Sequence, residues 1–267
     1  MELVFLGTRG EIGVATRRHR RHSALLVLHG RSRIMIDCGA DWLGKFEALN
    51  PTSIFITHAH PDHAWGLVNG APCPVYATRH TFAVLAGSLI ADKRQLSMRE
   101  PVRIDGLKIE AFGVIHSVRA PAVGFRITAS GNSFFYAPDL VAIRERAPAL
   151  RGVQLYIGDG ASITRPLVRR SQGTLIGHAP IRTQLGWCEK ERVPRAIFTH
   201  CGTEIVAGDG RRLSALVRRL GREHGVDAAI AHDGYRLYLA HHAPRGQGPR
   251  YRPGSRRAAR TGVQAGF

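Results

Sequence analysis

Residues 56–63 place three histidines and a carboxylate at a spacing that metal ions can use. The segment reads Ile-Thr-His-Ala-His-Pro-Asp-His and follows an apolar run at 54–56 that is typical of a buried strand. His58 and His60 are two residues apart, so in an extended chain their side chains project from the same face. Imidazole nitrogens and carboxylate oxygens are ligands of zinc, manganese and iron. Four donors within six residues are more than one tetrahedral ion with an open position can use, which predicts two ions close together. The alternative is a histidine-rich surface turn that binds nothing.

Further residues with metal-binding side chains come directly after later strands of the expected pattern. They are His116, Asp139, Asp159, His200 and His232. Side chains at strand ends can converge on one site, because rigid strands hold the ends of the loops in place. Each of these residues alone could be an ordinary turn residue, but their repetition favours a shared site.

The chain alternates strands and helices and is long enough for a substantial core. Strands are expected at 2–7, 23–29, 33–37, 53–57, 74–77, 102–104, 107–114, 122–128, 133–137, 153–157, 196–199, 227–231 and 235–240, and helices at 42–49, 79–87, 179–191 and 209–224. We expect one folded domain over residues 1–242. Residues 243–267 are rich in arginine, glycine and proline, which predicts a basic, flexible tail.

Composition indicates which binding partners and which cellular compartment to expect. The net charge of +18 favours polyanions such as nucleic acid, and the basic tail is a candidate contact for them, although an arginine-rich composition also arises in GC-rich genomes. No apolar stretch reaches the ~20 residues of a membrane span, and the N-terminus lacks the features of a signal peptide. The four cysteines are scattered, which indicates neither a zinc ribbon nor a disulfide framework. A cytoplasmic location is the simplest expectation, and a homodimer is left open.

The sequence resembles the metallo-β-lactamase superfamily of binuclear hydrolases up to about residue 241. The family's His-x-His-x-Asp-His motif matches residues 58–63, and segments 5–8 and 36–39 are similar to its first strand and its Leu-Ile-Asp-x-Gly-like segment. The resemblance implies an α+β fold, the αβ/βα four-layer sandwich of two mixed β-sheets with helices on the outside. It also implies two divalent metal ions, zinc or otherwise manganese or iron.

The family pattern implies a role for each matching residue. One ion would be held by His58, His60 and His116, the second by Asp62, His63 and His200, and Asp139 would bridge the two. The similarity is greatest to the phosphodiesterase branch, which includes tRNase Z and the cyclic-phosphate phosphodiesterase of bacterial phosphonate breakdown. In the latter a histidine 22 residues before the last metal histidine is the general acid, and His178 stands at that position. The catalytic residues implied are therefore Asp62 and His178, with a helix N-cap or a surface residue as the alternative for His178.

The sequence also departs from both enzymes of that branch. tRNase Z carries a long arm between the bridging aspartate and the last histidine, whereas we expect strands and helices to consume the 60 residues between Asp139 and His200. Its His-Phe-Ser-like motif is replaced by Thr-His-Cys-Gly at 199–202, and the scattered cysteines do not support the additional zinc site of the phosphonate enzyme. Membership of the branch is better supported than identity with either enzyme.

We therefore predict a metal-dependent hydrolase acting on a nucleotide-like or cyclic phosphodiester. Two ions would lower the pKa of a shared water toward neutrality, and His178 would protonate the leaving alkoxide. The candidates for binding the substrate are Arg165, Arg20 and His232, each of which could instead be a solvated surface residue. The alternatives are an RNA or DNA nuclease, a lactonase or thioesterase with the same ligands, and a nucleic-acid-binding protein with a structural metal site.

Overall fold

The computed structural model describes residues 1–239 of the 267-residue chain. The tail expected at 243–267 lies outside the described residues, as does the end of the expected domain at 240–242. Among the helices of residues 1–239, none combines the length and the apolar character needed to cross a lipid bilayer.

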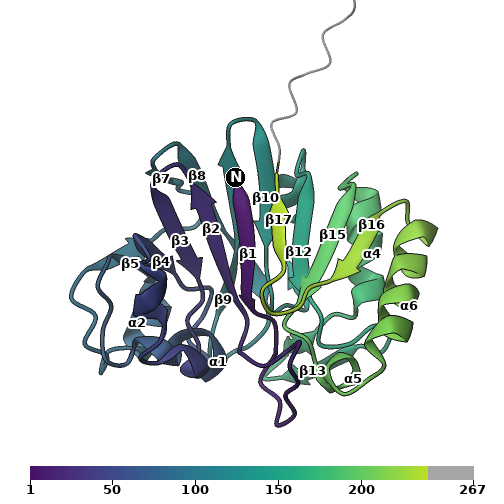
Figure 1. Ribbon diagram of the computed structural model, residues 1–267, viewed down its shortest axis with the longest axis horizontal. Helices are drawn as coiled ribbons and strands as arrows, with labels where there is room; N and C mark the ends of the chain where they lie inside the picture. Colours follow the sequence, from purple (N-terminus) through teal and green to yellow (C-terminus); the bar gives the residue numbers. More distant parts are fainter. Residues whose placement is uncertain (240–267) are drawn as a thin grey trace, which may run out of the picture.

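Within residues 1–239, the first sheet has seven strands in the order β17-β1-β2-β3-β4-β5-β6. Figure 1 shows those from β17 to β5. Their bounds are β1 (Glu2–Gly7), β2 (Ala24–His29), β3 (Ser32–Ile36), β4 (Ser53–Phe55), β5 (Val75–Thr78), β6 (Lys93–Leu96) and β17 (Arg236–Tyr238). Strands β17, β1, β2 and β3 pair antiparallel, whereas β3 to β6 pair parallel. The parallel strands therefore end at the same edge of the sheet.

Among the described residues the second sheet has eight strands, seven of them in the order β11-β8-β9-β10-β12-β15-β16, with β7 paired to β8. Their bounds are β7 (Val102–Ile104), β8 (Leu107–Ile115), β9 (Ala122–Ala129), β10 (Asn132–Tyr136), β11 (Ala142–Ile143), β12 (Leu155–Asp159), β15 (Arg195–Thr199) and β16 (Asp227–Ile230). Strands β10, β12, β15 and β16 are parallel to their neighbours in this series, and the remaining pairs are antiparallel.

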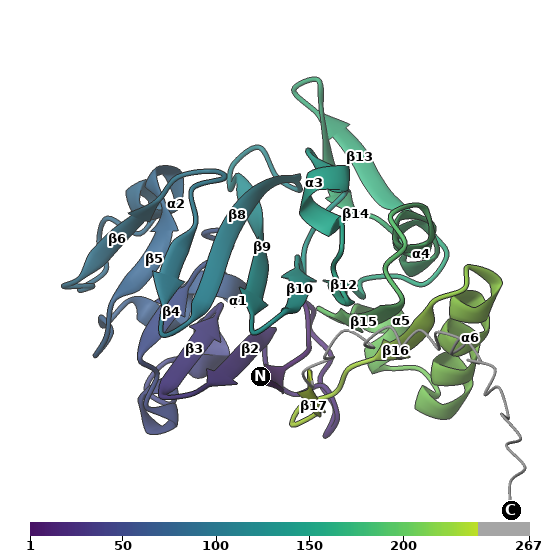
Figure 2. The same cartoon turned by 90° about the horizontal axis from the view of Figure 1, so that it is seen from above.

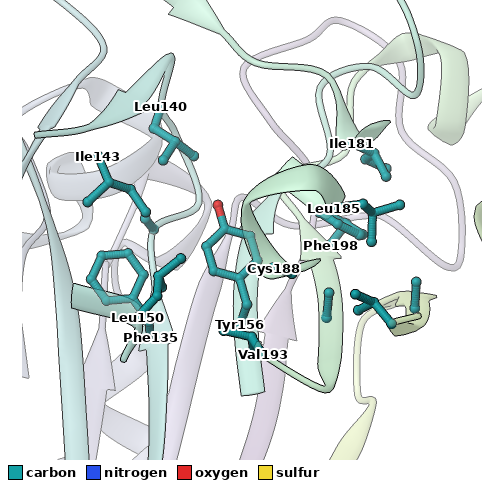
Figure 3. Packing of buried hydrophobic residues seen from close by; sticks show 14 of the residues in the cluster. Phe135, Leu140, Ile143, Leu150, Tyr156, Ile181, Leu185, Cys188, Val193 and Phe198 are labelled. Atoms are coloured by element: carbon teal, nitrogen blue, oxygen red, sulfur yellow. The ribbon is translucent and has the colours of Figure 1, made fainter. Parts of the chain in front are cut away.

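In the part of the chain that the structure describes, three hydrophobic cores separate four layers. The first core lies between the two sheets, where Phe55 of β4 and Phe125 of β9 make an edge-to-face contact with ring centroids 5.7 Å apart. The second lies between the second sheet and the helices α3 (Arg146–Leu150), α4 (Ile181–Lys190) and α6 (Gly210–Glu223). Figure 3 shows Phe135, Tyr156 and Phe198 of this sheet grouped with side chains of α4. The third core covers the other sheet with α1 (Pro61–Ala64), α2 (Arg79–Val84) and the short 3₁₀ helices η1 (Ala40–Trp42), η2 (Phe46–Leu49) and η3 (Trp65–Leu67). This order confirms the predicted αβ/βα sandwich.

The pattern at 42–49 predicted an α-helix, and this prediction was wrong. The chain forms η1 and η2 there, because Gly44 between them has a φ of 66°, which an α-helix excludes. The apolar residues of the pattern still serve the core, since Trp42 and Phe46 are both buried. The short elements β6, β11, α1, α3 and α5 (Thr203–Val206) were not expected from the sequence.

A hairpin outside both large sheets is the main departure from the expected pattern. Strands β13 (Leu167–Ser171) and β14 (Thr174–His178) pair only with each other and project from the domain (Figure 2). The expectation that the predicted strands and helices consume the 60 residues between Asp139 and His200 was therefore wrong, because this hairpin was not among them. The available signal was Gln172-Gly173, since both residues have positive φ, 48° and 76°, as a two-residue type I′ turn requires.

Candidate metal centre

The predicted metal-binding residues follow strands of both sheets. His116 and His200 come directly after β8 and β15, and His58 and Asp139 are each the third residue after β4 and β10. Val123 at the start of β9 donates its N–H to the carbonyl of Thr57, which joins this edge of the first sheet to the second. The side chains therefore meet where the strand ends of both sheets lie close together, and ligands bind beyond the carboxyl ends of strands in other α/β sheets.

The first group of donors consists of three histidines and Asp139. His60 Nδ1 lies 2.9 Å from His58 Nε2 and 3.2 Å from His116 Nε2. Asp139 Oδ2 lies 3.4 Å from His58 Nε2, and its Oδ1 lies 2.8 Å from His116 Nδ1. Donor atoms of all four side chains lie within 4.8 Å of one another, a spacing at which they could hold one ion.

The second group consists of Asp62, His63 and His200, all buried. Asp62 Oδ2 lies 3.2 Å from His63 Nε2 and 3.1 Å from His200 Nε2. Asp139 Oδ2 lies 3.6 Å from each of the same two nitrogens, so its carboxylate contacts both groups. This is the position that a bridging ligand between two ions requires.

Unpaired polar atoms in the cluster test whether these residues fit metal ions. Asp139 Oδ1, His63 Nε2 and His200 Nδ1 are buried and have no hydrogen-bond partner within residues 1–239. Imidazole nitrogens approach Asp139 Oδ1 closely, but not with hydrogen-bond geometry. Buried nitrogen and oxygen atoms normally have partners, because leaving them unpaired costs stability. The donor set, two histidine- and aspartate-rich groups that share one carboxylate, fits two divalent ions.

The electrostatics of the two groups differ. Burial lowers the pKa of His60 to about 4 and that of His58 well below its usual value, so these two imidazoles are neutral near pH 7. Burial alone would raise the pKa of Asp62, but His63 and His200 hold it below its usual value. Burial would lower the pKa of His63, whereas Asp62 and Asp37 raise it well above its usual value. A metal ion entering the second group would therefore displace a proton from His63.

Asp37 orients His63 from behind. Its fully buried carboxylate accepts hydrogen bonds from the Thr57 backbone N–H at 2.8 Å, from the Thr57 hydroxyl at 2.9 Å and from His63 Nδ1 at 2.9 Å. The last contact fixes the ring so that Nε2 faces Asp62 and Asp139. The sequence placed Asp37 in a family-like segment but assigned it no function.

Two site residues have a strained backbone. His200 has a φ of 53° and Asp37 a φ of 64°, in the left-handed region that costs non-glycine residues about 1–3 kcal/mol. Gly10 packs against the imidazole of His200, and a Cβ on Gly10 would lie only 3.0 Å from its Cε1. The surrounding loops therefore constrain His200 in an unfavourable conformation, which is common at functional sites.

His178 ends β14 and contacts two carboxylates at the edge of the cluster. Its Nδ1 lies 2.8 Å from Asp159 Oδ2 and 2.9 Å from Asp139 Oδ1. Fully buried Asp159 also accepts the backbone N–H groups of Leu140 and Ala161. Burial would lower the pKa of His178, but Asp159 and Asp139 raise it to about 11. With 24% of its side chain exposed, His178 can present a proton at the surface of the cluster.

Asp159 was one of the residues with metal-binding side chains that the sequence analysis expected to share a site, but no function was assigned to it. In the structure, it belongs to a third group of donors within 4.8 Å of one another: Asp139, Asp159, His178 and His200. The available signal was its position between Gly158 and Gly160. A Cβ on Gly158 would overlap the side chain of Gln184, so Asp159 follows a tightly enclosed backbone.

The three predicted substrate-binding residues have no direct contact with the cluster. Arg20 is exposed, and its backbone N–H donates to Asp233. Arg165 is exposed between β12 and β13, where its carbonyl accepts the hydroxyl of Ser162. His232 is half-buried, with its Nδ1 3.0 Å from the carbonyl of Asp233. Among residues 1–239 no hydrogen bond or ion pair joins them to the side chains of the donor groups described above. Their function in substrate binding stays a prediction.

Comparison with known proteins places the chain among related sequences and folds. Residues 32–201 match the family described as the beta-lactamase superfamily domain. Ribonuclease Z of Archaeoglobus fulgidus is 30% identical over 149 residues, an alignment that covers 47% of this chain and 47% of that protein. The chain therefore spans about half the length of the curated relative that it matches.

Solved structures with a similar fold cover most of the chain. A diphosphatase from the PhnP family has a TM-score of 0.68 at 21% identity, covering 90% of this chain and 98% of that chain. The metallo-beta-lactamase fold protein YhfI from Bacillus subtilis has a TM-score of 0.67 at 16% identity, covering 88% and 98%. The short form of human tRNase Z has a TM-score of 0.62 at 17% identity, covering 90% and 100%. At these identities the likeness shows the fold alone.

Proposed function

Because the chain belongs to the beta-lactamase superfamily, whose metallo-β-lactamase fold implies a metal-dependent hydrolase, we propose that it hydrolyses a phosphodiester. The observation that carries the proposal is the position of Asp139. Its carboxylate contacts both donor groups and also His178, so metal ions and a proton donor would act on the same small volume. Zinc is our first choice of metal because the donors are mostly imidazoles, with manganese or iron as alternatives.

We assign the ligands as the two groups of the cluster. His58, His60 and His116 would hold one ion, Asp62, His63 and His200 the other, and Asp139 both. When bound, the two ions would supply a water of lowered pKa and positive charge next to the phosphoryl oxygens. Asp37 would keep the ring of His63 in the orientation that binding needs.

His178 is the proposed general acid, and Asp159 is its positioning residue. The hydrogen bond from Nδ1 to the Asp159 carboxylate leaves Nε2 as the nitrogen that can donate a proton to a departing oxygen. The pKa of about 11 would keep this proton in place at neutral pH. An alkoxide leaves poorly without a proton, so a diester with a sugar or alkyl leaving group would depend on His178.

A phosphodiester is favoured over a lactone or thioester by charge and by the relatives. The chain carries a net charge of +18, which attracts phosphorylated substrates. The relatives named ribonuclease Z and PhnP-family diphosphatase bear names of phosphate chemistry. RNA cleavage is the second candidate function. It is supported by the similarity to ribonuclease Z, which extends over about half of that protein's length.

The test compares leaving groups in the purified protein. Wild type should hydrolyse bis(p-nitrophenyl) phosphate, and Asp139→Asn should lose this activity together with bound metal, measured by elemental analysis. His178→Gln should lose about 10²- to 10⁴-fold in kcat on a diester with a nucleoside leaving group, but little on the aryl diester, because p-nitrophenolate leaves without a proton. Equal losses on both substrates would refute the general-acid role.

A substrate panel should include cyclic nucleotides, linear RNA, pre-tRNA, a cyclic sugar phosphate and a lactone. Turnover of the lactone with no activity on any diester would overturn the proposal. Cleavage of RNA at a rate well above that of the cyclic diesters would select the second candidate.

A further inference from the structure

The hairpin β13–β14 is fixed at its base to the metal centre. The backbone N–H of Gly177 donates to the carbonyl of His116 at 2.9 Å, and His116 Nδ1 lies 3.1 Å from the carbonyl of Gly177. Gly177 has a φ of 111°, and a Cβ there would overlap the carbonyl of Leu167 on the paired strand. The base is thus tightly packed and attached to a predicted metal ligand, while the tip projects from the domain (Figure 2).

The register of the hairpin assigns its side chains to two faces. Leu167 pairs with His178 and Arg169 with Ile176, so these four side chains lie on one face, which we call the His178 face. Arg170 pairs with Leu175 on the opposite face. Because the ring of His178 contacts Asp139, the base of the His178 face looks onto the metal centre.

The two neighbouring arginines of the hairpin differ in their contacts. Arg170 donates from Nη1 to the carbonyl of Gly173 at 3.3 Å, within the turn of the hairpin. Arg169 is exposed, and among residues 1–239 its guanidinium has no hydrogen bond or ion pair. It lies two residues along the strand from Leu167, about 6.6 Å beyond the pair that contains His178. A free guanidinium at this position suits a phosphate, which it can bind with two parallel hydrogen bonds.

The role of His178 indicates which part of the substrate lies against the hairpin. This step rests on the proposed function, in which His178 protonates the departing oxygen. The departing group then lies along the His178 face, where Arg169 is the next charged side chain toward the tip of the hairpin. In a small cyclic diester the departing oxygen stays within the same molecule, and no second phosphate follows it. In a linear nucleotide strand, the departing nucleoside carries the next phosphate of the strand.

We propose that Arg169 binds a phosphate on the leaving-group side of a linear nucleotide strand, and so selects such strands over small cyclic diesters. Ile176, its partner on the same face, would offer an apolar contact to the sugar. Arg169 is a specificity-determining residue in this assignment, distinct from the residues that carry out the cleavage.

The test uses three dinucleotides with the same scissile diester: one without terminal phosphate, one with a 5′-phosphate and one with a 3′-phosphate. Wild type should prefer the dinucleotide whose phosphate lies on the leaving nucleoside, by about 10- to 100-fold in kcat/KM. Arg169→Gln should abolish this preference, and Arg169→Lys should retain part of it, because lysine keeps the charge without the planar fork. Arg170→Gln is the matched control, with the same charge change on the opposite face, and should keep the full preference.

The outcomes separate this proposal from the proposed function. A wild type that cleaves all three dinucleotides equally, or equal effects of Arg169→Gln and Arg170→Gln, would overturn the role of Arg169 while leaving a phosphodiesterase. Cleavage of aryl or cyclic diesters without any cleavage of dinucleotides would do the same. No hydrolysis of any phosphodiester by the metal-loaded protein would refute the proposed function itself.

Discussion

Replacing Asp37 with asparagine should weaken the second metal site and leave the first one loaded. Both oxygens of Asp37 accept hydrogen bonds: Oδ1 from Thr57 N–H and its hydroxyl, and Oδ2 from His63 Nδ1. An amide offers one acceptor oxygen and one NH₂ donor. In Asp37→Asn, the new NH₂ group must therefore lie against the N–H of either Thr57 or His63. Neither donor would then have an acceptor, and water cannot reach this buried site.

Metal affinity should fall about 10- to 100-fold, or by about 1.4–2.7 kcal/mol, which is the usual effect of removing a hydrogen-bond partner of a metal ligand. A second effect opposes it. Asp37 helps to raise the pKa of His63, so its neutralisation makes the proton of His63 easier to displace. This compensation is largest at low pH, where displacing that proton limits binding. The loss of affinity in Asp37→Asn should therefore be greater at pH 8.5 than at pH 6.5.

The assay is a competition titration of metal-stripped protein with zinc and a chelating indicator at both pH values. Wild type should bind two ions, and Asp37→Asn should bind one with unchanged affinity and the other more weakly. Asp92→Asn is the control, because Asp92 is an exposed carboxylate paired with Arg94 and should leave both affinities unchanged. Two ions bound by Asp37→Asn with wild-type affinity at both pH values would refute the reasoning, provided that its circular dichroism matches that of wild type.

Two further predictions concern the loop between β1 and β2. Gly10→Ala should displace the ring of His200 and lower metal affinity and diester hydrolysis at least about 10-fold, because its Cβ would lie 3.0 Å from that ring; Gly87→Ala, with nothing within 4 Å, should behave as wild type in both assays. His19 is buried, which lowers its pKa to about 4. Between about pH 6.5 and pH 4, His19 therefore binds a proton in the unfolded chain but not in the folded chain. Stability should therefore fall as the pH drops from about 6.5 to 4, by at most about 3 kcal/mol and less where solvent reaches the ring. Urea unfolding should show a smaller fall in His19→Gln, and an identical pH profile would contradict this account.

The sequence by itself determined the elements with strong local patterns. The core strands and α4 and α6 lie within a few residues of their expected positions, since each has apolar periodicity over its own length. It also identified residues 58–63, because a strand followed by a proline turn sets the directions of these side chains locally. His116, Asp139 and His200 were noted as metal-binding side chains after strands, and their assignment as ligands came from the family resemblance. The structure brings these three residues together with residues 58–63.

Only the tertiary structure decided which partners surround those ligands. Asp37 reaches His63 across 26 positions, and Asp159 reaches His178 across 19, through packing between strands that no local spacing encodes. The hairpin that carries Arg169 has exposed residues on both strands and no apolar alternation, so its pattern did not distinguish it from a loop. Local sequence sets the geometry of side chains within one strand or turn. The way in which two sheets and a hairpin close around them depends on contacts between distant segments, so the proposed proton donor and the proposed substrate-binding side follow only from the tertiary structure.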